Sequence, residues 1–564
     1  MNRMFMPFAA LSIVISLSAH AQAVSEVWNP DRGSEYVNPV INADYSDPDV
    51  CRVGNDYYMT SSSFNCLPGL QILHSTDLVN WKIIGAALTD YPGTEFPDDD
   101  WRTRPQHGCG VWAPAIRYHE GEFYIYCGDP DRGIFMVKTK DPAGAWEPPV
   151  WVVKAKGFID PCPMWDEDGR AYLSHGCAGS RAGLKSVLFM AEMSSDGTRL
   201  ISPSRIIYDG HLTQPTIEGT KLYRHDGRYY IFSPAGGVAT GWQTVLRSDS
   251  PWGPYEERIV MAQGNSSVNG PHQGAWVDTP SGEHWFIHFQ DKEAYGRVVH
   301  LQPMVWKDDG WPVIGVDEDG DGTGEPVMRY RKPDLPASVV CQPAESDDFC
   351  SSVPGLQWQW QAVPSPYWSF ADASGSGVLR MYSVCQDADW KNLADSPNLL
   401  LQKFPAERFT VTATVSFVAN PQLKQKGEYG GLVVMGQDYA LLRIRDCADG
   451  RFLEMVRCHD ALKDGKEEIC ASVPLRYEVA AAYVPSEAYL RVSVRPEGNP
   501  SSAVPDAICT FSYSHDGKKW HSLGPEFRAL PGKWIGAKVG LVCNRHHQKN
   551  DSGWMDVDWF RVTK

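Results

Sequence analysis

Residues 216–233 read TIEGTKLYRHDGRYYIFS. An Asp-Gly dipeptide, Asp226-Gly227, separates two segments that are rich in aromatic and branched side chains. Asp-Gly accepts the positive backbone angles that a two-residue hairpin turn requires. The stretch therefore predicts a strand, a tight turn and a second strand, with one carboxylic acid, Glu218, nine residues before the turn glycine.

The same pattern occurs four more times between residues 36 and about 330. The copies are VGNDYYMTSSS around Gly54, HEGEFYIYCG around Gly121, DEDGRAYLSHG around Gly169 and PSGEHWFIHFQ around Gly282, and successive glycines are 67, 48, 58 and 55 residues apart. Strand–turn–strand units that repeat about every 50 residues have the size of propeller blades. The sequence therefore predicts an all-β fold that begins with a five-bladed β-propeller.

One residue just upstream of each repeat glycine is expected to lie near the propeller axis, because the innermost strand of each blade lines that axis. These residues are Asp47, Trp112, Asp160, Glu218 and His272. Carboxylates, an aromatic wall and a histidine at one point are the composition of a site that cleaves sugars. Simpler interpretations exist for three of them: a Ser-Asp-Pro turn at Asp47, a buried core side chain at Trp112 and a hydrogen-bonded core histidine at His272.

The N-terminal residues 1–23, MNRMFMPFAALSIVISLSAHAQA, have the features of a signal peptide. One positive charge, Arg3, precedes a short apolar run and endings of the small-x-small type. The run is too short to span a bilayer, and no other transmembrane candidate follows. We therefore expect the mature protein to be exported, to the periplasm or to the medium.

The chain of 564 residues is too long for one core, and its texture changes near residue 334. We expect the propeller at 24–333, a proline-bearing linker at 334–348 and a second domain at 349–564. Segments 409–417, 430–444, 489–495, 508–514, 537–543 and 554–562 alternate polar and apolar residues and lack the blade pattern. They predict an antiparallel, jelly-roll-like β-sandwich.

The net charge and the cysteine spacing argue against certain partners and against a zinc site. The formal charge of −17 argues against nucleic acid and anionic membrane surfaces. The 14 cysteines show no C-x-x-C pair of a zinc site, and export permits disulfides whose pairing the sequence does not give.

Two places suggest a structural calcium ion. Asp317, Asp319 and Asp321, followed by Gly322, match the first half of a calcium loop, but Met328 replaces the expected final Glu. A solvated acidic turn is the alternative there. Asp348 and Asp558 lie near the two ends of the predicted sandwich and could share an ion, or be two unrelated surface acids.

The chain resembles glycoside hydrolase family 43, the group of β-xylosidases and α-L-arabinofuranosidases. The stretches that carry the resemblance are NPVINADYSDPDVCRVGNDYYMTSSSF, GVWAPAIRYHEGEFYIY, IDPCPMWDEDGRAYL, IEGTKLYRHDGRYYIF and GRVVHLQPMVWKDDGWPVIG. The resemblance implies a five-bladed propeller, a C-terminal sandwich of the kind appended to xylosidase-type members, and an inverting mechanism. It implies that Asp47 is the general base, Glu218 the general acid, and Asp160 the residue that orients Glu218 and raises its pKa.

The resemblance also implies secondary roles. His272 corresponds to a histidine that helps hold a cation or water near the propeller centre, and Arg297 to an arginine that contacts the sugar. Trp112 and Phe64 are expected as stacking surfaces for the sugar. The chain departs from the family pattern at four positions near these residues: Asp49, Cys162, Thr220 and Gln273.

Inversion needs one protonated carboxyl to donate to the leaving oxygen and one ionised carboxylate, on the opposite face, to activate water, with the two about 6.5–9.5 Å apart. Residues of different blades can supply that gap. No cofactor is required for this chemistry.

We therefore expect an exo-acting hydrolase that releases xylose, L-arabinose or both from plant cell-wall xylan oligosaccharides or arabinoxylan side chains. The alternatives are a relative that acts on arabinan or galactan, and a non-catalytic glycan-binding propeller.

Overall fold

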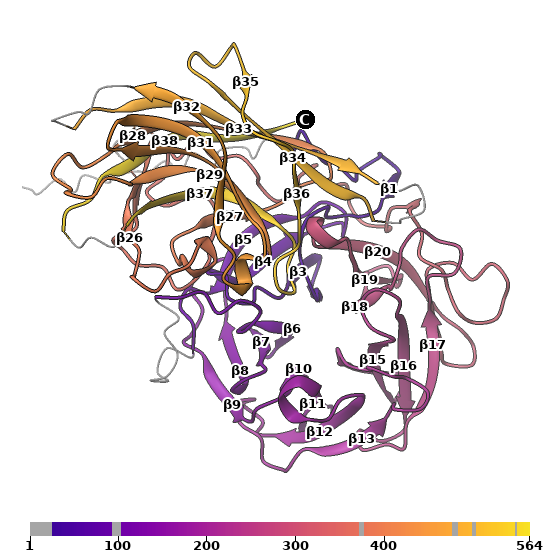
Figure 1. The fold of residues 1–564 in the computed structure, drawn as a ribbon. Helices are drawn as coiled ribbons and strands as arrows, with labels where there is room; N and C mark the ends of the chain where they lie inside the picture. The colour runs from indigo at the N-terminus through magenta and orange to yellow at the C-terminus, as the bar shows by residue number, and fades with distance from the viewer. Residues whose placement is uncertain (1–24, 93–102, 372–376, 477–482, 499–503, 547–549) are drawn as a thin grey trace, which may run out of the picture.

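The computed structural model describes residues 25–92, 103–371, 377–476, 483–498, 504–546 and 550–564. They form two β units, a ring of blades and a two-sheet sandwich that covers one side of it (Figure 1). The predicted signal peptide, residues 1–23, lies outside these ranges. Among the described helices, none has the length and apolar character needed to cross a membrane.

The ring is a five-bladed propeller, as predicted, and each blade is a four-stranded antiparallel sheet of consecutive strands. The strands, blade by blade, are β2 (Asp49–Val53), β3 (Asp56–Thr60), β4 (Gly69–Ser75) and β5 (Lys82–Leu88); β6 (Trp112–His119), β7 (Glu122–Asp129), β8 (Gly133–Thr139) and β9 (Val150–Lys154); β10 (Phe158–Trp165), β11 (Ala171–Cys177), β12 (Val187–Met193) and β13 (Arg205–Asp209); β14 (Lys221–His225), β15 (Arg228–Ala235), β16 (Trp242–Ser248) and β17 (Glu256–Met261); and β18 (His272–Asp278), β19 (His284–Asp291), β20 (Arg297–Trp306) and β21 (Pro312–Ile314).

The central hairpin forms as the sequence predicts. His225 pairs with Arg228, so that β14 and β15 are joined by a two-residue turn. The turn residues Asp226 and Gly227 have φ angles of 46° and 77°. Two consecutive positive φ angles define the type I′ turn, whose twist matches that of the flanking strands.

The ring is closed by contacts between its first and last blades. The innermost strands of the first four blades pack against one another in order, β18 of the last blade packs against β15 of the fourth, and β18 also contacts β2 of the first. Short strands β1 (Glu35–Val37) and β22 (Arg329–Arg331) pair antiparallel and join the two ends of the propeller chain. The ring therefore holds its shape without sharing a strand between blades.

The second unit is a sandwich of two eight-stranded sheets. One sheet contains β23 (Gln359–Trp360), β26 (Val384–Cys385), β27 (Leu400–Lys403), β29 (Tyr429–Met435), β30 (Tyr439–Cys447), β31 (Gly450–Cys458), β32 (Glu467–Arg476) and β37 (Lys538–Arg545); the other contains β24 (Ser369–Ala371), β25 (Leu379–Tyr382), β28 (Phe409–Val418), β33 (Ser486–Glu497), β34 (Asp506–Ser514), β35 (His521–Ser522), β36 (Phe527–Ala529) and β38 (Trp554–Thr563). A large apolar core lies between the two sheets.

The predicted segment 430–444 is two strands rather than one. β29 and β30 form a hairpin in which Met435 pairs with Tyr439. Gly436 begins the turn, where a Cβ atom would lie 1.9 Å from the backbone oxygen of Leu530. The close approach of that neighbouring backbone requires a glycine, and the chain reverses there.

The two units are joined by a continuous seam. Leu67 of the first blade exchanges backbone hydrogen bonds with Trp360 of β23. Tyr295 of the last blade packs in the sandwich core. In return, the backbone N–H of Gly536, in the loop before β37, donates to Asp44 Oδ2 at 3.0 Å. The sandwich is therefore attached to both ends of the ring.

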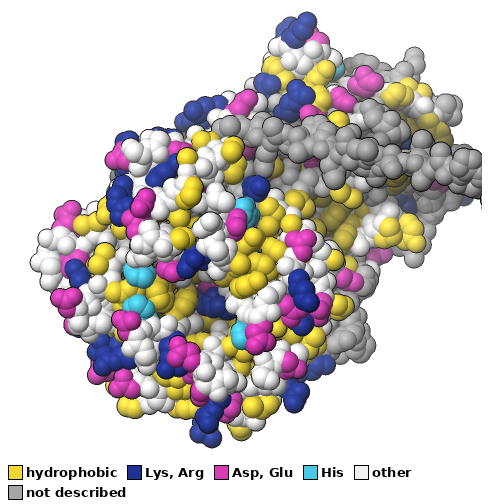
Figure 2. All heavy atoms as spheres, turned by 180° about the vertical axis from the view of Figure 1, so that it is seen from behind, with side chains coloured by type: hydrophobic (Ala, Val, Ile, Leu, Met, Phe, Trp, Pro, Cys, Tyr) yellow, Lys and Arg dark blue, Asp and Glu magenta, His cyan; other side chains and the backbone are white. Residues whose placement is uncertain are grey.

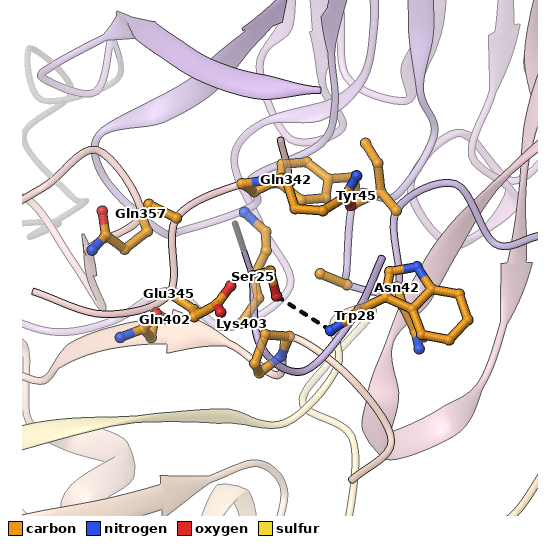
Figure 3. A pocket seen from close by; sticks show the side chains of 14 residues that line it. Ser25, Trp28, Asn42, Tyr45, Gln342, Glu345, Gln357, Gln402 and Lys403 are labelled. Carbon is orange, nitrogen blue, oxygen red and sulfur yellow. Dashed lines mark hydrogen bonds between the residues drawn. The ribbon is translucent and has the colours of Figure 1, made fainter. Parts of the chain in front are cut away.

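A cavity of about 30 Å³ lies at this seam (Figure 3). Its lining includes Glu345 of the linker and Lys403 of β27. Burial raises the pKa of Glu345 to about 7, and burial together with nearby Lys538 lowers the pKa of Lys403 to about 7. Because one water needs about 10–15 Å³, the cavity has room for about two waters and is too small for a sugar.

The surface of the propeller seen from behind carries acidic and basic side chains interspersed, with hydrophobic side chains gathered around the centre of the face (Figure 2). No stretch of one charge sign dominates this view. All 14 cysteines are free thiols. The disulfides that export would permit are therefore not formed in this structure.

Candidate active site

The five residues predicted to converge lie around one pocket on the propeller axis. Its volume is about 120 Å³, four times that of the seam cavity. The lining includes every residue predicted as catalytic or as a sugar contact, together with five residues that were not predicted. The full set is Asp47, Phe64, Trp112, Ala113, Ile159, Asp160, Glu218, Val238, His272, Gln273, Arg297 and Trp534.

A repeated backbone feature turns these side chains toward the axis. Within the first three residues of its innermost strand, or two residues before it, each blade has one residue with positive φ: Asp47 (54°), Ala113 (35°), Asp160 (56°), Gly219 (65°) and Gln273 (33°). In three blades the residue belongs to a β-bulge, where the register shifts between Trp112 and Ala115, Ile159 and Cys162, and His272 and Gly274. Bulges re-aim side chains, and non-glycine residues with positive φ cluster at functional sites.

Asp47 accepts hydrogen bonds from several donors. Its Oδ2 accepts from the hydroxyls of Ser46 at 2.8 Å and Ser62 at 2.6 Å, and its Oδ1 from Arg297 Nη1 at 3.4 Å. An ionised carboxylate is an acceptor only, so this set of donors matches its hydrogen-bonding capacity. The side chain is thereby held at the pocket wall as an acceptor.

Asp160 holds the segment that carries Glu218. Its Oδ2 accepts from the backbone N–H of Gly219 at 2.8 Å, and its backbone oxygen accepts from the Thr220 hydroxyl at 2.8 Å. Burial first, and then the neighbouring charge of Glu218, raise the pKa of Asp160 well above its usual range; the Gly219 hydrogen bond acts in the opposite direction. Because two close carboxyls resist losing both protons, the pair retains one proton to higher pH than a single carboxyl would.

We expect Asp160→Asn to shift the alkaline limb of the pH profile of kcat/KM. Burial and the neighbouring charge of Glu218 raise the pKa of Asp160, so the substitution removes the carboxyl that keeps the pair's shared proton to higher pH. The alkaline limb should move to lower pH by about one unit, and kcat should also fall because the contact to Gly219 changes. A limb that stays in place, measured between pH 4 and pH 9, would contradict the shared proton.

An aromatic wall faces the carboxyls. Trp112 lies edge to face with Phe64, with ring centroids 6.3 Å apart, and with Trp534, 6.0 Å apart. The indole N–H of Trp112 donates to the backbone oxygen of Gly108 at 3.0 Å, which fixes the ring. Aromatic surfaces of this kind stack on the apolar faces of sugars and bury much area.

Trp534 comes from the sandwich, in the loop between β36 and β37, and the sequence analysis missed it. It has φ of 67°, unusual for a bulky residue. Two hydrogen bonds to the propeller hold its loop: the backbone N–H of Gly536 donates to the Asp44 carboxylate, and that of Ala537 to the Ala294 backbone oxygen at 2.8 Å. The repeat pattern and the family resemblance pointed only to propeller residues, and Trp534 belongs to the other domain.

Arg297 and His272 both line the pocket, as expected for residues near the axis. Arg297 packs over the Phe289 ring at 4.9 Å and donates to Ser46 Oγ at 2.7 Å. His272 is 1% exposed, and its Nε2 is 3.6 Å from Glu218 Oε1. Within the described ranges, no trio of ligating side chains includes His272, so a cation there stays a prediction.

The calcium predictions have mixed outcomes. Asp317, Asp319 and Asp321 lie close enough to hold an ion, but Asp317 already accepts from the backbone N–H groups of Gly320 and Gly322 in its own turn. Asp348 is 3.2 Å from Arg561, and Asp558 is exposed on β38. The ion shared by Asp348 and Asp558 stays a prediction, without a supporting contact among the described residues.

The arrangement can perform acid–base cleavage of a glycosidic bond. Asp47, held by donors, and Glu218, paired with a buried acid, come from different blades and have different environments. An ionised carboxylate that accepts hydrogen bonds and a second carboxyl that carries a proton are the base and the acid of such a reaction. The aromatic wall and Arg297 can bind the sugar between them.

Comparison with known proteins agrees with this geometry. Residues 36–312 match the model of "Glycosyl hydrolases family 43", and residues 346–563 match "Beta xylosidase C-terminal Concanavalin A-like domain". A β-xylosidase of Formosa agariphila is 31% identical over 96% of this chain and 92% of that protein. A non-reducing end α-L-arabinofuranosidase of Bacteroides ovatus is 29% identical over 93% of this chain and 94% of that protein. The crystal structure of a xylan β-1,4-xylosidase from Bacillus halodurans superimposes with a TM-score of 0.79 at 24% identity, over 94% of this chain and 100% of that one, and shows the same fold.

Proposed function

This chain belongs to glycosyl hydrolase family 43 and is a glycoside hydrolase, and from that premise we propose that it is exo-acting and inverting. Its proposed substrates are xylan-derived oligosaccharides and arabinoxylan side chains, from which it releases xylose, L-arabinose or both. Relatives named as a β-xylosidase and as a non-reducing end α-L-arabinofuranosidase support this substrate class.

The observation that carries the proposal is the placement of three carboxyls from three blades around one axial pocket whose wall includes a side chain of the sandwich. A binding protein has no need for a buried acid against a second acid, because that pair costs desolvation and repulsion. The contribution of Trp534 to the pocket wall also favours a chain end over the middle of a polysaccharide, and thus exo action.

In the proposed mechanism each residue has one role. Asp47 takes a proton from the water that attacks the anomeric carbon, while Glu218 donates a proton to the leaving oxygen. Asp160 is a positioning residue that fixes the Glu218 segment through Gly219. Arg297 and the aromatic wall hold the sugar, and no cofactor takes part in the proposed steps.

The experiment is release of nitrophenol from aryl β-D-xyloside and aryl α-L-arabinofuranoside. Turnover of either one supports the proposal, and the ratio of kcat/KM values identifies the preferred sugar. Arabinan and galactan chains are assayed beside them, since hydrolysis of those alone would favour the related polysaccharide activity. Absence of turnover on all four would leave the non-catalytic glycan-binding alternative.

We expect Trp534→Ala to raise KM for xylobiose about tenfold, the effect of losing an aromatic contact worth about 1–1.5 kcal/mol, with a smaller change in kcat. The carboxyls belong to the propeller and are not touched by this change. Tyr367→Ala, an exposed aromatic elsewhere on the sandwich, is the matched control. An unchanged KM would show that Trp534 does not contact the sugar.

We also propose that the protein is exported. The signal-like residues 1–23 support periplasmic or extracellular action on plant cell-wall polysaccharide. Cell fractionation, with N-terminal sequencing of the mature protein, tests this: a start at or near residue 24 is expected, and an intact Met1 would contradict it.

A further inference from the structure

Gln273 occupies, in the fifth blade, the position that Asp47 occupies in the first blade and Asp160 in the third. Asp47 in the first blade and Asp160 in the third are the residues with positive φ near the start of their innermost strands. Gln273 is that residue in the fifth blade, with φ of 33°, and it lines the same pocket. The fold therefore aims this side chain at the site where two other blades place their carboxyls.

The bulge explains why two consecutive side chains face the pocket. His272 pairs with Phe289 and Gly274 pairs with His288, so Gln273 is the extra residue on β18. In a regular strand, neighbouring side chains point to opposite faces. Here both His272 and Gln273 line the pocket, and the bulge continues into Gly274, where a Cβ atom would lie 1.8 Å from the Ile287 oxygen.

The carboxamide nitrogen of Gln273 is buried without a hydrogen-bond partner among the described residues. The residue is 3% exposed, and its side chain ends in this unpaired Nε2 at the pocket wall. A buried polar atom left unpaired costs about 1–3 kcal/mol. Such a group, at the wall of a pocket and on a strained backbone, is accounted for if a bound molecule supplies the missing hydrogen bond.

The carboxamide also lies next to the proposed acid. A Cβ atom on Gly219 would come within 2.8 Å of Gln273 Cδ, so the amide packs against the backbone that follows Glu218. A group at this place meets the sugar whose bond Glu218 protonates. Amides carry both donors and an acceptor, and a sugar hydroxyl is likewise donor and acceptor.

We propose that Gln273 is a specificity-determining residue that hydrogen-bonds one hydroxyl of the monosaccharide unit held in the axial pocket. The inference rests on the proposed function, since it takes a pentose as the sugar. This hydrogen bond raises kcat/KM for a substrate that has the hydroxyl. It lowers kcat/KM for a substrate without the hydroxyl, because the amide is then left buried and unpaired.

The test compares wild type with Gln273→Met on nitrophenyl β-D-xyloside and its 2-, 3- and 4-deoxy analogues. Methionine keeps the length of the side chain and, as a non-glycine residue, the same backbone strain, but has no amide. For the parent xyloside we expect kcat/KM to fall about 10- to 100-fold. For one deoxy analogue the two proteins should agree within about twofold, since the hydroxyl that Gln273 binds is already missing.

Equal losses on all four substrates, or no loss on the parent, would overturn the inference and leave the proposed function intact. Thermal melting is a second readout: removal of an unpaired buried amide should leave Tm unchanged or raise it, whereas a purely structural role would lower Tm and affect every substrate alike. If the arabinofuranoside is the preferred sugar, its deoxy series replaces the xyloside series.

If the wild-type protein hydrolyses neither pentoside, the proposed function is wrong whatever the role of Gln273. That role is then tested by measuring the binding of monosaccharides. Titration of intrinsic tryptophan fluorescence with D-xylose, L-arabinose and D-galactose uses Trp112 and Trp534 as reporters. At least tenfold weaker binding of one sugar by Gln273→Met would support the inference. Equal binding by both proteins, or no binding of any sugar, would overturn it.

Discussion

Glu218→Gln is expected to lower kcat on xylobiose about 10³-fold, because glutamine cannot protonate the leaving sugar oxygen. The loss should depend on the leaving group. In an aryl xyloside with an acidic phenol, the phenolate leaves without being protonated. The kcat for that substrate should therefore fall only about tenfold. The side chain is 36% exposed at the pocket, so the change leaves the propeller core intact.

The control for Glu218→Gln is Glu318→Gln, which changes an exposed acid on the same domain and should be silent. A loss that is equal for xylobiose and for the activated aryl xyloside would show that Glu218 does not donate the proton. Circular dichroism and thermal melting of both variants separate chemistry from misfolding.

Asp47→Asn should lower kcat about 10³- to 10⁴-fold on every substrate, whatever the leaving group, because the attacking water loses its base. A loss of 10³ corresponds to about 4 kcal/mol of transition-state stabilisation. Asparagine has nearly the size of aspartate, so the contacts with Ser46, Ser62 and Arg297 change in charge more than in shape.

Azide sharpens the Asp47 experiment. It is a nucleophile that needs no base, so it should restore turnover of an activated xyloside in Asp47→Asn and yield a glycosyl azide. With xylobiose, Glu218→Gln should not respond, since its missing proton concerns the leaving group. Azide that rescues neither variant, or Asp47→Asn with wild-type activity, would remove Asp47 from the base role. Asp317→Asn, in the acidic turn, is the control.

The axial residues could be predicted because a propeller converts a linear repeat into a circle. Glu218 lies at a fixed offset from the Asp226-Gly227 turn, and Asp47 and Asp160 lie at similar offsets from their own glycines. The repeat therefore located three carboxyls without any knowledge of contacts. The fold class followed from the same repeat.

Trp534 and Gln273 could not be predicted in this way. Trp534 reaches the pocket from another domain, and its position depends on the seam between Gly536 and Asp44, a contact between residues 492 positions apart. Gln273 faces the pocket only because a bulge breaks the alternation of β18. Strict alternation would point the side chains of His272 and Gln273 to opposite faces of the sheet. A prediction from alternation would therefore turn Gln273 away from the pocket.

Nine sandwich strands were also missed, and the longest of them are β31 and β32. β32 contains Pro474 and is the edge strand of its sheet, where a proline is tolerated because one side of the strand lacks a pairing partner. Its run of charged residues and the proline obscure the alternation that the buried strands show. Interior strands such as β28 and β37 were found from their patterns.

The central claim is that Asp47 activates water while Glu218 protonates the leaving oxygen, which gives inversion. The most direct measurement is proton NMR of the first-formed anomer during hydrolysis of an aryl β-D-xyloside, before mutarotation. The account predicts α-D-xylose as the initial product. Initial β-D-xylose would mean retention through a covalent intermediate, and would contradict the roles given to both carboxyls.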